Sequence, residues 1–356
     1  MDDISPARRP SKLCRTHGGD NGVRQFAIHS QTICEASIFS CADYILPFLE
    51  PPELAAVAST CKVLNSIARA INIRRSTDAS RGFEKYHIPF VNLMDDQPYS
   101  YFIYTRTQLR NSDAIRRQAW GFPDSPIGVG SSQIGDEEED EEEVSFESGS
   151  GCDCERCGEE CPCGLGFEDV GVVSECGKGC GCGMECGKRM SQRGICVRLK
   201  IVKNGRKGWG LYAAEFIQRG QFVCEYAGEL LTTNEARRRQ AIYDQCSKNC
   251  QSSSALLVVR EHLPSGKACL RINIDATKVG NIGRFINHSC DGGNLSSIII
   301  RSSGTLLPRL CFYASTDIQE GDELSFSYGS TRLRSNGLQC LCGSSSCCGS
   351  LPSEVT

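Results

Sequence analysis

Hydrophobic residues between Ala42 and Ile73 recur every three to four positions, which is the spacing of one face of an α-helix. Pro51-Pro52 interrupts this pattern, because proline suits the first turn of a helix but removes a hydrogen bond from its interior. The pattern predicts short amphipathic helices in a small N-terminal segment, residues 42–75. Residues 1–41 are polar and mixed, and they are predicted to be disordered.

From residue 195 onward the hydrophobic pattern changes to a period of two, which is typical of half-buried strands. Val197, Leu199 and Ile201 alternate with basic residues, and Asn204-Gly205 predicts a hairpin turn. Further apolar runs, most of them bounded by Gly or Asp, lie at residues 222–226, 271–274, 297–300, 309–313 and 323–328. One helix is predicted near residues 234–243, with Thr232 or Thr233 as its cap. The fold class is therefore mainly β with short helices.

Charge is distributed unevenly along the chain. The formal net charge is −4, yet Asp136 to Glu143 is a run of eight acids, so the rest of the chain carries +4. This run lies in a Gly-, Ser- and Pro-rich stretch, residues 121–151, that predicts a flexible acidic insertion. No apolar run reaches membrane-spanning length and no signal pattern opens the chain, so we expect an intracellular protein without a membrane partner.

Nine of the 24 cysteines fall within 35 residues, a density that core packing does not explain. They are Cys152, Cys154, Cys157, Cys161, Cys163, Cys176, Cys180, Cys182 and Cys186. An odd number argues against a disulfide framework, whereas thiolates on tight Gly-rich turns can converge on tetrahedral zinc. If three thiolates bridge and six are terminal, nine sulfurs fully coordinate three zinc ions. The sequence therefore predicts a three-zinc cluster.

Such a cluster carries about three excess negative charges. Residues 178–207 contain nine Lys or Arg against the single acid Glu185, which could neutralise this excess. The alternative interpretation is that the basic stretch is a DNA-binding surface. We favour the local role, so direct DNA contact is not expected to be the primary interaction.

Four further motifs follow the cluster in a fixed order. They are Gly208-Trp209-Gly210, GNIGRFINHSC at residues 280–290, ELSFSYG at residues 323–329, and CLCGSSSC at residues 340–347. The last motif lacks a fourth zinc ligand, which Cys290 could supply beside Cys340, Cys342 and Cys347. A fourth zinc, making about four per chain, would then tie the C-terminal tail to the Asn287-His288 loop.

In this order the motifs resemble the SET-domain protein lysine methyltransferases of the suppressor-of-variegation group, in its plant "related" branch. The resemblance runs from about Lys85 to Cys347. It implies a pre-SET zinc module at residues 84–194, a SET catalytic domain at 195–330 and a post-SET zinc loop at 336–350. The expected fold is thus a SET-domain β fold flanked by a three-zinc cluster and a one-zinc loop.

The resemblance also implies a separate role for each of the motif residues. S-adenosylmethionine would be held by Gly208, Trp209, Gly210, Arg284, Asn287, His288 and Tyr328. Tyr328 would be the catalytic tyrosine, and Tyr226 would line the channel that admits the substrate lysine. Phe326 matches a switch position at which phenylalanine permits di- or trimethylation. Ala255 stands where the family usually has a further channel tyrosine, and Ser327 where it commonly has aspartate.

By this resemblance, the leading hypothesis is a nuclear, chromatin-bound histone-lysine methyltransferase that acts in silencing. Its partner would be the histone H3 tail or the nucleosome, with lysine-9 as the target. The alternatives are a catalytically weak SET scaffold and a methyltransferase of non-histone proteins. Residues 42–75 are similar to an F-box, which docks ubiquitin-ligase adaptors, although a helical cap on the larger domain explains the same pattern.

Overall fold

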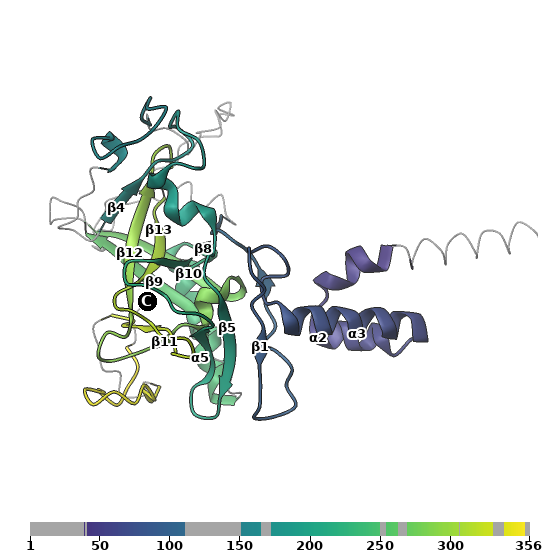
Figure 1. The fold of residues 1–356 in the computed structure, drawn as a ribbon. Helices are drawn as coiled ribbons and strands as arrows, with labels where there is room; N and C mark the ends of the chain where they lie inside the picture. Colours follow the sequence, from purple (N-terminus) through teal and green to yellow (C-terminus); the bar gives the residue numbers. More distant parts are fainter. Residues whose placement is uncertain are drawn as a thin grey trace, which may run out of the picture. The chain divides into compact units, whose positions relative to one another are not determined.

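The computed structural model describes residue 39 and residues 41–110, 151–164, 172–249, 254–262, 269–305, 307–329 and 338–352 (Figure 1). The chain divides into two compact units, residues 1–71 and residues 72–356. The acidic run and residues 1–38 lie outside the described residues, so the predictions of disorder there stay predictions. None of the described helices combines the length and the apolar character needed to cross a membrane.

The N-terminal unit is helical, as its hydrophobic spacing predicted. It contains the 3-10 turn η1 (Leu46–Phe48), helix α2 (Pro51–Ala58) and the start of helix α3 (Lys62–Thr77). Pro51 occupies the first turn of α2, where the missing N–H costs no hydrogen bond, and the Glu53 side chain accepts from the Glu50 N–H at 2.9 Å. Ala42, Leu46, Leu54, Ala68 and Ile71 form a small core of their own.

The described residues of the second unit form mostly short strands, which are arranged in four sheets. One sheet has the order β1 (Phe90–Val91), β5 (Leu199–Asn204) and β6 (Gly208–Ala213). Another has the order β2 (Ile103–Tyr104), β10 (Cys269–Gly280), β8 (Gly228–Leu231) and β3 (Leu109–Arg110), with β9 (Leu256–His262) also paired to β10. The antiparallel pairing of β5 and β6 confirms the hairpin predicted at Asn204-Gly205.

The other two sheets carry the C-terminal motifs. Strand β4 (Val172–Glu175), then β12 (Leu295–Ser302), β13 (Arg309–Ala314) and β7 (Phe222–Glu225) form a four-stranded sheet, and Figure 1 shows β12 and β13 side by side. The two-residue strands β11 (Asn287–His288) and β14 (Ser325–Phe326) pair with each other. The remaining elements are α5 (Thr233–Asn249) and the 3-10 turns η2 (Pro162–Gly164), η4 (Gly187–Arg193) and η5 (Ile282–Phe285).

Several observed elements differ in length from the predicted ones; strands β10 and β12, for example, extend beyond the apolar runs at residues 271–274 and 297–300 at both ends. Helix α5 begins as predicted, with the Thr232 Oγ1 accepting from the Glu235 N–H at 3.3 Å, but it continues to Asn249. Strand β14 is much shorter than the apolar run at residues 323–328. The Leu324 N–H bonds to the Leu211 carbonyl at 2.8 Å and the Tyr328 N–H bonds to the His288 ring at 3.2 Å. The backbone N–H groups at both ends of the run therefore form hydrogen bonds outside the β11–β14 pairing.

Candidate active site and metal centres

The Asn-His and Phe-Ser-Tyr motifs meet in the parallel pair β11–β14. Asn287 lies opposite Ser325, and His288 lies opposite Phe326. The backbone N–H groups on both sides of the β14 strand bond elsewhere, that of Leu324 to the Leu211 carbonyl and that of Tyr328 to the His288 Nδ1. This pairing brings together two motifs that lie far apart in the sequence, and it sets the geometry of the candidate site.

Aromatic rings form a continuous cluster beside this pair. The Phe326 ring centroid lies 4.6 Å from that of Phe312 and 4.9 Å from that of Tyr328. The Tyr328 ring also lies 5.2 Å from the His288 ring, and Tyr226 lies 6.4 Å from Phe312. Phe312 and Phe326 are buried, so the phenol groups of Tyr226 and Tyr328 are set among apolar surfaces.

Both phenol hydroxyls donate to backbone carbonyls. The Tyr328 hydroxyl donates to the Ile286 carbonyl at 2.8 Å, and the Tyr226 hydroxyl donates to the Ala255 carbonyl at 2.7 Å. Burial raises the pKa of both tyrosines above the ordinary value, because the charged phenolate is poorly solvated among these rings. The two phenols are therefore neutral at physiological pH, with their oxygen lone pairs free to accept.

His288 connects the aromatic cluster to the C-terminal cysteines. Its Nδ1 accepts from the Tyr328 N–H at 3.2 Å, which assigns the ring proton to Nε2. Nε2 lies 3.2 Å from the Cys290 Sγ. Burial lowers the pKa of His288, so the neutral tautomer is the stable form. The histidine thus fixes the backbone of Tyr328.

Asn287 is held by a carboxylate that the sequence analysis did not single out. Its Nδ2 donates to the Glu323 Oε1 at 2.8 Å and to the Trp209 carbonyl at 3.4 Å. The other oxygen of Glu323 pairs with the Lys207 Nζ at 2.7 Å. At Gly210 an added Cβ would lie 3.0 Å from both Asn287 Nδ2 and Glu323 Oε1, so a larger residue there would push against both members of this hydrogen bond.

Arg284 supplies a buried donor without a partner among the described residues. Its Nη1 has no hydrogen-bond partner there, although the guanidinium lies over the rings of Phe102 and Phe285 at 4.9 and 5.2 Å. Burial lowers the pKa of Arg284. Trp209 packs edge-on against Phe90 at 5.3 Å, and Gly208 has a φ of 77°. The unpartnered Nη1 of this buried guanidinium fits an anionic group such as a carboxylate, and the glycine-lined backbone of β6 beside Asn287 fits the close approach of a polar cofactor.

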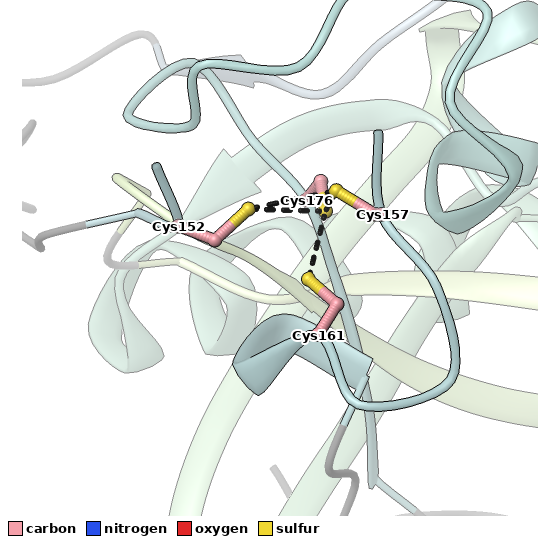
Figure 2. A group of neighbouring side chains, drawn as sticks. All are labelled: Cys152, Cys157, Cys161 and Cys176. Carbon is pink, nitrogen blue, oxygen red and sulfur yellow. Dashed lines mark hydrogen bonds between the residues drawn. The ribbon is translucent and has the colours of Figure 1, made fainter. Parts of the chain in front are cut away.

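The cysteine cluster is brought together by the fold. Its sulfur atoms form three overlapping groups of four, each within 4.8 Å: Cys152, Cys157, Cys161 and Cys176; Cys152, Cys163, Cys176 and Cys180; and Cys157, Cys176, Cys182 and Cys186. Figure 2 shows the sulfurs of the first group pointing toward one another. Cys154 belongs to none of these groups, but its thiol interacts with those of Cys152 and Cys161.

Three of these cysteines have the positions that bridging ligands need. The Cys157 Sγ lies 3.6 Å from those of Cys152 and Cys176, which are 4.0 Å apart. Tetrahedral zinc with a Zn–S bond of about 2.3 Å places its sulfurs roughly 3.8 Å apart. Each of the three belongs to at least two of the groups of four. The donor set therefore fits zinc, with these three thiolates shared between ions.

The fourth group joins Cys290 to the C-terminal tail. The sulfurs of Cys290, Cys340, Cys342 and Cys347 lie within 4.8 Å of one another, and the Cys290 and Cys340 Sγ atoms are 3.7 Å apart. These spacings also fit tetrahedral zinc. This set is the one that the sequence spacing predicted.

Several basic residues of the stretch 178–207 have local partners. The Arg189 Nη2 donates to the carbonyls of Gly177 and Cys182 at 2.7 and 2.9 Å, and it lies 3.6 Å from the Cys182 Sγ. Lys203 and Lys207 pair with Asp95 and Glu323. These contacts support a local role for two of the charges: Arg189 lies beside the cysteine cluster, and Lys207 pairs with the carboxylate that holds Asn287.

Sequence reasoning missed Glu323, Phe312 and the carbonyls of Ile286 and Ala255. Phe312 lies in the apolar run at residues 309–313, where Leu310, Cys311 and Phe312 are all buried, so periodicity does not single it out. Glu323 and the carbonyls carry no local signal, because their roles depend on contacts with residues far away in the chain.

Comparisons with known proteins agree with this geometry. A family model described as "SET domain" matches residues 208–329. "Histone-lysine N-methyltransferase SUVR3" of Arabidopsis thaliana is 54% identical over 326 residues, which cover 89% of this chain and 92% of that protein.

Two solved structures have the same fold. One is Arabidopsis thaliana SUVH6 in complex with SAM, with a TM-score of 0.57 and 26% identity over 80% of this chain and 59% of that chain. The other is KRYPTONITE in complex with mCHH DNA, an H3(1-15) peptide and SAH, with a TM-score of 0.55 and 25% identity over 77% of this chain and 53% of that chain.

Proposed function

Because the chain belongs to the SET-domain family of histone-lysine N-methyltransferases, we propose that it methylates lysine-9 of the histone H3 tail, with S-adenosylmethionine as the methyl donor. The H3 tail of the nucleosome would be its partner, and the reaction would take place in the nucleus and serve chromatin silencing. The H3 peptide in the KRYPTONITE complex supports the choice of substrate.

The placement of the Tyr328 hydroxyl is the observation that carries this proposal. The hydroxyl donates to the Ile286 carbonyl, and the Tyr328 ring packs against the rings of Phe326 and His288. A lysine amine has an ordinary pKa of about 10.4, and only its neutral form can attack a methyl group. Apolar rings lower that pKa by desolvation, and the neutral phenol and carbonyl oxygens accept N–H bonds that orient the lone pair.

The cofactor would lie along the glycines of β6 and the β11 strand. Gly208, Trp209 and Gly210 would present backbone groups, Asn287 and His288 would border the cofactor, and Arg284 would offer its unpaired Nη1 to an anionic group. When bound, S-adenosylmethionine supplies a methyl group activated on a cationic sulfonium. Tyr226 and Tyr328 would orient the amine toward that group.

Phe326 sets the proposed product state. Its ring packs between Phe312 and Tyr328, so no hydroxyl from this position holds a water molecule beside the amine. A methylated amine can then rotate and be methylated again. We therefore expect di- or trimethyl-lysine as the product.

Zinc would hold the two cysteine sites together, at about four ions per chain. Cys152, Cys157 and Cys176 would bridge, and the other six cysteines of the cluster would be terminal ligands. Cys290, Cys340, Cys342 and Cys347 would hold the fourth ion, so the tail would be fixed beside His288.

The test is transfer of labelled methyl from S-adenosylmethionine to recombinant histones and octamers, with Asn287→Ala and Tyr328→Phe as controls. The expected result is incorporation on H3 at lysine-9 that both variants lose, with the methyl count read by mass spectrometry. Incorporation on another lysine would overturn the lysine-9 assignment. No incorporation on any histone by a zinc-loaded, cofactor-binding protein would favour a non-histone substrate.

A further inference from the structure

Arg309 joins four elements of the second unit through one buried guanidinium. Its Nη2 donates to the Glu175 Oε2 at 3.1 Å, the Ser191 Oγ at 2.6 Å and the Ser302 Oγ at 3.1 Å, while its Nη1 donates to the Glu225 Oε2 at 3.3 Å. These partners lie on β4, η4, β12 and β7. The side chain is 17% exposed, so its charge is largely removed from solvent.

The Glu175 side of this contact belongs to the cysteine cluster. Glu175 directly precedes Cys176, the residue shared by all three groups of four. Strand β4 pairs in parallel with β12, with Glu175 opposite Ser302, and the Ser303 N–H donates to the Glu175 carbonyl at 3.0 Å. An added Cβ at Gly177 would lie 1.8 Å from the Ser303 carbonyl oxygen, so the backbone segments at Gly177 and Ser303 are in direct contact. The cluster is thus docked on the sheet that carries Arg309.

The Glu225 side of the contact belongs to the aromatic cluster. Glu225 directly precedes Tyr226, whose N–H donates to the Leu310 carbonyl at 2.8 Å, and Leu310 directly follows Arg309. Arg309 and its neighbour therefore hold Glu225 by the side chain and Tyr226 by the backbone. A displacement of β13 would move Tyr226 and, through its hydroxyl bond, change its distance to Ala255.

The charges at this junction make the guanidinium difficult to replace. Glu175 and Glu225 are both buried, and they share the single cation of Arg309. Among the described residues the Glu225 Oε1 has no hydrogen-bond partner. A flat guanidinium can serve several acceptors at once, whereas a lysine ammonium at the same place is a single point charge.

We propose that Arg309 is a positioning residue that couples the metal-loaded cysteine cluster to Tyr226. The cysteine cluster fixes the positions of Glu175 and Ser191. Arg309 bonds to both of them, and this fixes the position of β13. Strand β13 in turn holds Tyr226 at the place where the substrate amine binds. This inference rests on the proposed function for the role of Tyr226, but the coupling itself does not require that methyl transfer occurs.

The test is hydrogen–deuterium exchange of the full chain, read over residues 222–231 with and without zinc. In the wild type, removal of zinc from the cluster should raise exchange at Tyr226. In Arg309→Lys exchange there should already be raised in the zinc-loaded protein and should respond little to zinc removal. Arg301→Met is a matched control, because Arg301 lies on β12 of the same sheet as Arg309 and pairs with the buried Glu261 of β9. It should leave exchange at Tyr226 unchanged.

Kinetics and metal content give a second readout. With zinc content and cofactor affinity kept within about twofold of the wild type, Arg309→Lys should lower kcat about tenfold, since small misplacements of an orienting group cost rate more than binding. Ser302→Ala removes one hydrogen bond of Arg309 but leaves both of its ion pairs in place, so it should lower kcat by a smaller factor. Two results would overturn the coupling. One is that zinc removal does not change exchange at Tyr226 in the wild type; the other is that it still raises exchange there in Arg309→Lys. An absence of methyl transfer with the exchange pattern intact would instead count against the proposed function.

Discussion

Replacing Glu323 with glutamine should loosen Asn287 while leaving the volume of the side chain unchanged. Glu323 accepts from the Asn287 amide through one oxygen at 2.8 Å and pairs with Lys207 through the other at 2.7 Å. Glutamine offers one acceptor and one NH₂ group. Whichever way the amide turns, its NH₂ faces either the NH₂ of Asn287 or the ammonium of Lys207.

The size of the effect follows from these two contacts. A hydrogen bond with a charged partner contributes about 1.5–3 kcal/mol to stability. The ion pair is about one-fifth exposed on both sides, so solvent screening limits its share to below about 1 kcal/mol. Only part of the loss reaches the cofactor, through the orientation of Asn287. We expect about 2 kcal/mol, which is roughly a 30-fold rise in the dissociation constant of S-adenosylmethionine.

Calorimetric titration with S-adenosylmethionine measures this directly, and zinc content and the unfolding midpoint show whether the fold is kept. Glu320→Gln is the matched control, because it removes the same charge from an exposed position three residues away. The control should bind as the wild type does. Wild-type affinity in Glu323→Gln, alongside weakened binding in Asn287→Ala, would refute the view that Glu323 orients Asn287.

Four other outcomes are expected. Cys342→Ser should release one zinc of about four and abolish methylation, which metal analysis and the transfer assay would show; retained activity would contradict the role of the tail. Phe326→Tyr should shift the product toward monomethyl-lysine, read by mass spectrometry, and an unchanged methyl count would refute the role of this ring. Tyr328→Phe should lose activity. In the wild type burial raises the pKa of Tyr328, so the rate should rise with pH as the substrate amine deprotonates and should not fall through phenol ionisation near pH 10. Burial also raises the pKa of Glu225 from 4.5 to about 7, so the native state binds this proton more tightly than the unfolded chain. The free energy of unfolding should therefore fall by about 3 kcal/mol between roughly pH 4.5 and pH 7 relative to Glu225→Gln, and equal slopes in denaturant titrations would contradict the assignment.

Much of the fold could be predicted because its signals are local. Alternation with a period of two identified β5, apolar runs identified β7, β10, β12 and β13, and helical spacing identified the N-terminal helices. Cysteine spacing predicted which thiols would cluster. It could not predict which of them are shared, because that depends on where β4 places Cys176 among the first five cysteines.

The candidate site shows why the rest could not be predicted. The motifs predicted which residues belong to the site. The hydrogen-bond partners of these residues depend on strand pairings between segments that are far apart in the sequence. Asn287 meets Glu323 beside the parallel pairing of β11 with β14, and the backbone N–H groups of Leu324 and Tyr328 that flank β14 bond to the Leu211 carbonyl and the His288 ring. Ala255 illustrates the same limit. The resemblance led us to expect a tyrosine at this position, yet the Ala255 carbonyl accepts from the Tyr226 hydroxyl, and a backbone group can do this with any side chain attached. Substitution at a motif position therefore removes a function only when the side chain, and not the backbone, performs it.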